Sequence, residues 1–195
     1  MWGDKCFPPN EWSVEKLLHL FNSQGGPKPR GTNQSYHEIL ELLLTGTIDS
    51  MELKIEPTKS PTPPAKGGRY GKDWAIFKTC RLGGGDLHSW LKWWAFKWLE
   101  CQAEAPPELE CTIRGYGRAD LFSPERRTIV ECGNTSPLHV MSFLEMAPDN
   151  RFILIPFQRG AIANTGALCV TPLKAFVFWK AHIKSACPTF VDIRT

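Results

Sequence analysis

The sequence predicts a mixed α/β (α+β) domain in which helices cover a central mixed sheet. Between residues 86 and 157, segments with helical or strand periodicity follow one another in the order α-β-β-β-α-β. Apolar residues make up 42% of the 195-residue chain, and eight Trp supply large side chains for a core. We therefore predict an N-terminal helical segment at 1–56, a Pro/Gly-rich linker at 57–73 and an α/β domain at 74–195.

Charge and cysteine usage exclude several classes of protein. The net charge of +3 permits a local nucleic-acid-binding patch without arguing for one. The seven Cys are scattered and form no CxxC pair, so we expect reduced thiols and no structural zinc. The N-terminus lacks a signal-peptide pattern, and no apolar run is long enough to span a membrane. We therefore expect a cytoplasmic protein without membrane association.

The N-terminal segment is predicted to contain two helices and a short strand. Apolar spacing predicts helices at 11–22, with Asn10 as a cap, and at 34–45, followed by a strand at 51–56. Two short helices also suggest a helix-turn-helix regulator. However, residues 34–45 contain three acids or imidazoles and no Lys or Arg, so they do not form a basic recognition helix. That function ranks last.

The remaining elements follow from local spacing, caps and turn residues. A helix is expected from Asp86, a good cap, to about residue 102, and Ser136 with Pro137 begins another at 136–146. Thr171 and Pro172 are expected to open a last helix at about 172–186. Strands are predicted at 74–80, 109–115, 151–157 and 168–170.

Two acids in a hairpin at 117–133 are the most informative feature of the chain. With a turn at 123–126, Asp120 faces Ile129 and Arg118 faces Glu131. Asp120 and Glu131 then lie on one face, diagonal to each other, and can converge on one cation. Mg²⁺ or Mn²⁺ held by these two carboxylates would form a metal site able to act on phosphodiester bonds. Alternatively, Asp120 is a surface acid paired with Arg118. A one-residue change in the loop would reverse the face of one acid.

The order of elements and these acids resemble the PD-(D/E)XK nuclease superfamily over about residues 74–158. The match consists of Asp120 after Gly-Arg-Ala, and of Glu131 within Ile-Val-Glu-Cys-Gly. The resemblance implies a restriction-endonuclease-like core, Mg²⁺ or Mn²⁺ as cofactor, and hydrolysis of DNA with Asp120 and Glu131 as catalytic metal ligands. The chain departs from the family where Gly133 stands in place of the motif lysine.

A subset of the superfamily, the competence-protein nuclease-like families, is similar in another respect. It carries a His-x-x-x-Lys pattern on the first helix and an acid at the start of the first meander strand. Here His88 and Lys92 have that spacing and share a helix face, and Glu110 is the acid. The resemblance implies that Lys92 supplies the missing cation, that His88 contacts phosphate or carries a proton, and that Glu110 is an accessory metal ligand.

Other interpretations of these residues stay open. Lys92 lies among four Trp, and in the alternative interpretation it only extends its amine from a packed helix. The four Trp either stack on nucleic-acid bases or belong to the core, and their helical spacing favours the core. Arg114 and Arg118 are the basic residues best placed to contact phosphate. Asn134 lies just before a predicted helix N-terminus, where backbone N–H groups either meet phosphate or are simply capped.

Two functions follow from the sequence. The first is a metal-dependent nuclease that hydrolyses DNA phosphodiester bonds. The second is a catalytically degenerate nuclease fold that binds DNA or a protein partner, as an inhibitor encoded by a plasmid, phage or other mobile element. Gly133 and the modest net charge motivate the second function. Resemblance of fold does not decide between them.

Overall fold

A computed structural model describes residues 5–6, 11–22, 30–54, 71–82, 85–101, 104–157, 162–164, 168–170 and 174–181. The helices are α1 (Val14–Phe21), α2 (Asn33–Leu44), α3 (Lys72–Cys80), α4 (Asp86–Glu100) and α5 (Pro137–Met146). The strands are β1 (Lys5–Cys6), β2 (Ile48–Lys54), β3 (Glu108–Ile113), β4 (Gly117–Ser123), β5 (Thr128–Cys132), β6 (Arg151–Ile155), β7 (Ile162–Asn164), β8 (Leu168–Val170) and β9 (Lys174–Lys180).

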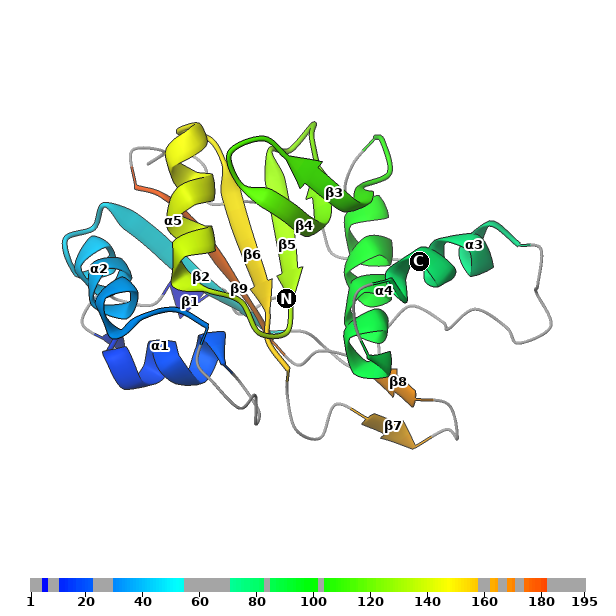
Figure 1. The fold of residues 1–195 in the computed structure, drawn as a ribbon, viewed down its shortest axis with the longest axis horizontal. Helices are drawn as coiled ribbons and strands as arrows, with labels where there is room; N and C mark the ends of the chain where they lie inside the picture. Colours follow the sequence, from blue (N-terminus) through cyan, green and yellow to red (C-terminus); the bar gives the residue numbers. More distant parts are fainter. Residues whose placement is uncertain are drawn as a thin grey trace.

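Seven strands form one mixed sheet in the order β1-β2-β9-β6-β5-β4-β3, and β7 pairs with β8 separately. Neighbouring strands run antiparallel except for the parallel pair β5–β6. Helices α1, α2 and α5 pack on one face of the sheet and α4 on the other, with α3 against α4 (Figure 1). The predicted α+β class and the order α4-β3-β4-β5-α5-β6 are confirmed.

The N-terminal segment is built into this sheet. Helix α1 begins after Ser13, whose hydroxyl accepts the N–H of Lys16 at 3.2 Å, so the cap predicted at Asn10 is wrong. The predicted strand at 51–56 is found as β2, and it pairs along its length with β9. Residues 57–70 of the predicted linker lie outside the described residues, and α3 begins at Lys72.

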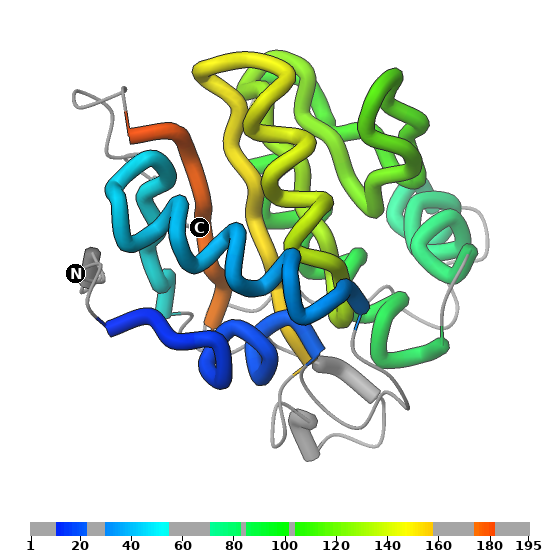
Figure 2. Tube along the Cα trace, turned by 60° about the vertical axis from the view of Figure 1, so that its left-hand side comes forward, coloured from blue at the N-terminus to red at the C-terminus, as the bar shows by residue number. Residues whose placement is uncertain are grey.

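Two predicted elements are wrong in type. Residues 74–80, predicted as a strand, belong to helix α3, where Phe77 and Cys80 are buried with Trp93 of α4. A short apolar run fits either periodicity, and only packing decides between them. Within the helix predicted at 172–186, Lys174–Lys180 form strand β9 instead, a continuous apolar run that is buried on both faces. The predicted start at Thr171 and Pro172 and the predicted end at 182–186 lie outside the described residues. Figure 2 shows β9, in red, beside β6.

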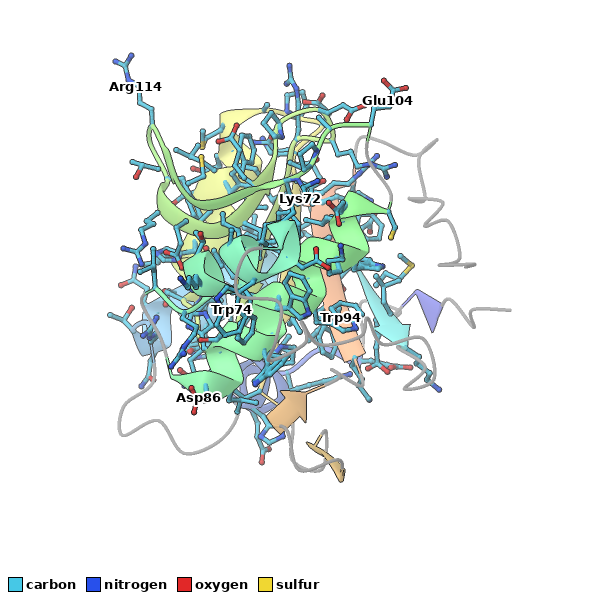
Figure 3. The ribbon with its side chains drawn as sticks, turned by 90° about the vertical axis from the view of Figure 1, so that its right-hand side faces the viewer. Lys72, Trp74, Asp86, Trp94, Glu104 and Arg114 are labelled. Atoms are coloured by element: carbon cyan, nitrogen blue, oxygen red, sulfur yellow. The ribbon has the colours of Figure 1, made fainter. Side chains whose placement is uncertain are left out.

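The Trp-rich helix α4 is a core helix. Trp93, Trp94 and Trp98 are at most 4% exposed, which supports the core interpretation rather than base stacking. Figure 3 shows α3 and α4 in front of the sheet, with Trp74 on α3 and Trp94 on α4. The N-cap of α4 is Gly85, so Asp86 is its first residue and not its cap as predicted. Among the helices that the structure describes, none is long and apolar enough to cross a membrane.

Candidate active site

The hairpin has a different register from the predicted one. Leu121 pairs with Val130 and Ser123 with Thr128, so the loop is 124–127 instead of 123–126. The turn closes through the N–H of Arg127, which donates to the Pro124 carbonyl at 3.1 Å. Because the loop still has four residues, the predicted parity of the two arms is kept. Extending the register puts Asp120 opposite Glu131, whereas the predicted register made them diagonal.

The ladder between β3 and β4 is interrupted beside this hairpin. Leu109 pairs with Leu121 and Cys111 with Ala119, but the pairing skips Glu110 and Asp120. Glu110 has a φ of +54°, which is rare for a residue other than glycine. Leu121 packs in the core on the α4 side, and Ala119 packs in the core on the opposite side. The side chains of β4 therefore do not alternate across the interruption, although the register is the same on both sides of it.

Helix α4 delivers both of its predicted site residues to Asp120. His88 Nε2 lies 2.9 Å from Asp120 Oδ2, and Lys92 Nζ lies 4.0 Å from Asp120 Oδ1. The two residues are one helical turn apart, so they present the same face of α4 to the sheet. The N–H of Cys132 donates to Asp120 Oδ2 at 2.8 Å, which fixes the carboxylate from the β5 side. The grouping expected from the His-x-x-x-Lys pattern is thus present.

Lys92 and Glu110 form a buried ion pair. Lys92 is 0% exposed, and its Nζ donates to Glu110 Oε1 and, at 2.6 Å, to the Leu82 carbonyl. The other oxygen of Glu110 lies 2.5 Å from the guanidinium of Arg118. Both oxygens of Glu110, the predicted accessory ligand, are therefore engaged by cations. Arg118 pairs with Glu110, and not with Asp120 as the alternative interpretation had it.

The remaining predicted residues lie further out. Arg114 lies at the outer end of the β3–β4 turn and points away from α4 (Figure 3). Asn134 precedes α5, and its carbonyl accepts a hydrogen bond from Arg30 at 3.2 Å. Its buried side-chain oxygen has no hydrogen-bond partner within the described part of the chain. Neither residue contacts Asp120 or Glu131 in any described interaction.

Glu131 is held from the opposite side of the sheet. Tyr116 donates its hydroxyl proton to Glu131 Oε1 at 2.7 Å, and the backbone of Asp120 supplies another hydrogen bond. The Tyr116 ring packs against His139 and Phe143 of α5. Asp120 is therefore held from the α4 side and Glu131 from the α5 side, and the link between them is the hydrogen bond from the Asp120 backbone to Glu131. The shared face predicted from alternation is not what brings them together.

The electrostatics of Glu131 are those of a buried acid beside a second acid. Burial and, after it, the charge of Asp120 raise the pKa of Glu131 to about 8, although the Tyr116 hydrogen bond lowers it. A divalent cation between the two carboxylates would relieve this repulsion. No group of three or more His, Cys, Asp or Glu able to bind a metal occurs among the residues with described positions. Two carboxylates nevertheless suit Mg²⁺, which takes its other ligands from water and phosphate.

Gly133 stands at a position where a side chain would collide with its surroundings. Gly133 has a φ of +84°, and a Cβ built on it would collide with the ring of Phe157. The N–H of Gly133 also donates to the Ile155 carbonyl at 2.7 Å, which fixes the backbone here. A lysine at this position would require a different backbone and a displaced Phe157. The lysine described beside Asp120 is instead Lys92 of α4, at 4.0 Å.

Tyr116 is the site residue that the sequence did not reveal. It lies in the β3–β4 turn, where an aromatic residue has no local signal of contact with an acid 15 positions away. The one signal in the sequence is the pair of flanking glycines, Gly115 and Gly117, because glycine favours the positive φ that both adopt in this turn.

No family model, curated protein or solved structure matches the chain. The nuclease resemblance therefore rests on the motifs in the sequence.

Proposed function

We propose that the protein is a metal-dependent nuclease that hydrolyses DNA phosphodiester bonds, with Asp120 and Glu131 holding Mg²⁺ or Mn²⁺. The observation that supports this most is the position of α4, which brings His88 to 2.9 Å and Lys92 to 4.0 Å from Asp120. Gly133 cannot carry the motif lysine, so a cation from the helix takes its place.

The chain supplies each chemical role in this proposal. Bound Mg²⁺ would stabilise negative charge on the phosphate and lower the pKa of an attacking water. His88 is oriented by its hydrogen bond to Asp120 and can carry a proton. Lys92 is buried 4.0 Å from Asp120, and its positive charge acts more strongly in such surroundings than it would at the surface. Arg118, which is half exposed, can contact a phosphate outside the site.

The test is DNA cleavage by the purified protein with Mg²⁺ or Mn²⁺ and with EDTA. Asp120→Asn and Glu131→Gln are expected to lower cleavage by more than about 100-fold, because each removes a charged metal ligand. Both variants should also lose Mn²⁺ binding, measured by electron paramagnetic resonance. Asp149→Asn is the control, since Asp149 is a surface acid paired with Arg127. Wild-type protein that neither binds Mn²⁺ nor cleaves DNA would end this proposal.

One observation favours the second candidate, a degenerate nuclease fold that acts by binding DNA or a protein. The charge of Lys92 is already neutralised by Glu110, and the side chain is 0% exposed. If binding is the function, Asp120→Asn and Glu131→Gln should leave the affinity for DNA or partner unchanged. This candidate would be excluded if a folded Asp120→Asn variant still bound its partner but lost the biological activity of the wild-type protein.

A further inference from the structure

The β3–β4 turn is built to fold Tyr116 back over the α5 side of the sheet. The N–H of Tyr116 donates to the Ile113 carbonyl at 3.1 Å and closes the turn. Gly115 and Gly117 have φ values of +85° and +114°, in the region that favours glycine. The position of Tyr116 is therefore set by the backbone on both sides of it.

Packing then fixes the Tyr116 ring. Its centroid lies 5.1 Å from that of His139 and 5.7 Å from that of Phe143, which meets it edge to face. His139 is itself held, because its Nδ1 lies 3.2 Å from the hydroxyl of Thr135, a residue that is 1% exposed. A ring locked in this way presents its hydroxyl in one direction.

That direction is toward Glu131. The hydroxyl donates to Glu131 Oε1 at 2.7 Å, and Glu131 is only 9% exposed. The bond engages one oxygen of the carboxylate and restricts its rotation, on the side opposite to His88 and Lys92. Partners of this kind orient metal ligands, and their loss weakens metal binding by about 10-fold to 100-fold.

We infer that Tyr116 is a positioning residue that holds the Glu131 carboxylate ready to bind the metal. The inference rests on the proposed nuclease function and extends it to a residue outside the motifs. A purely structural Tyr116 would contribute through its ring, which Phe would replace. The hydroxyl is the part that acts on Glu131.

The test is Mn²⁺ binding by Tyr116→Phe, titrated by electron paramagnetic resonance on the whole chain. We expect binding about 10-fold to 100-fold weaker than that of the wild type. The matched control is Tyr36→Phe, which removes the hydroxyl of a fully buried Tyr on α2 that bonds to Asn22 and to the Arg30 carbonyl. Tyr36→Phe should bind Mn²⁺ as the wild type does.

The outcomes separate the two proposals. Unchanged or tighter Mn²⁺ binding by Tyr116→Phe overturns this inference alone, whereas a wild type without Mn²⁺ binding overturns the proposed function with it. If Tyr116→Phe does not fold, nuclear magnetic resonance of the wild-type Tyr rings decides. The Tyr116 signals should shift on addition of Mg²⁺ while those of Tyr36 stay, and a Tyr116 ring insensitive to Mg²⁺ overturns the inference.

Discussion

Replacing Glu131 by Gln should remove a pH dependence of stability that the metal-free wild type shows. Burial and the charge of Asp120 raise the pKa of Glu131 from 4.5 to about 8 in the folded protein. At a pH between these two pKa values, Glu131 is ionised in the unfolded chain and protonated in the folded chain. The folded state then binds more protons than the unfolded state, so the free energy of unfolding falls as pH rises.

The size of the effect follows from one proton. Each pH unit inside this window lowers the free energy of unfolding by about 1.4 kcal/mol. The side-chain amide introduced by Glu131→Gln keeps an oxygen that accepts the Tyr116 hydroxyl, so the variant isolates the ionisation. Urea unfolding followed by Trp fluorescence, with EDTA present, measures the free energy at each pH.

The test compares the free energy of unfolding against pH for the wild type with that for Glu131→Gln. Other acids contribute to the slope of both proteins, and Asp149→Asn controls for removal of a surface carboxylate. The wild type should lose stability relative to Glu131→Gln as pH rises, with the difference levelling off above about pH 8. Parallel curves for the two proteins would refute the assignment of a raised pKa to Glu131.

The other predictions concern the ion pair, the glycine and the histidine. Lys92→Met should destabilise the fold by about 3–5 kcal/mol in urea unfolding, because Glu110 stays buried without its main cation. The double variant Lys92→Met/Glu110→Gln should be more stable than Lys92→Met alone. If the stability losses of the two single variants simply add in the double variant, the two residues are not coupled. Gly133→Ala should cost more than about 1 kcal/mol, because of its positive φ and the Phe157 ring, and an unchanged melting temperature would contradict this. His88→Gln should lower cleavage by about 100-fold with Mn²⁺ binding retained, and wild-type cleavage rates would exclude a role for His88.

Local signals predicted the middle of the chain well. Ser136 and Pro137 mark the start of α5, and the structure shows Ser136 as the cap with Pro137 as the first helical residue. Helices α2 and α4 and strands β3 to β6 also lie close to their predicted ranges. Caps, turn residues and periodicity act within a few residues of one another, so they can be read without knowledge of the fold.

The wrong assignments share one cause. Residues 74–80 and strand β9 are short apolar runs that suit a helix or a strand equally well. Phe77 is helical because α3 packs against α4, and β9 is a strand because β2 and β6 flank it. Those neighbours lie far away in the sequence, where local periodicity carries no information about them.

The sequence alone determined the order of elements, two acids on adjacent strands, and His88 with Lys92 on one helix face. These depend on spacing within a segment. The tertiary structure alone decided that α4 reaches Asp120, that Glu110 turns to Lys92 through a positive φ, and that Tyr116 bonds to Glu131. Such contacts join residues up to 32 positions apart, and they arise from how helices pack on the sheet and where its ladder breaks.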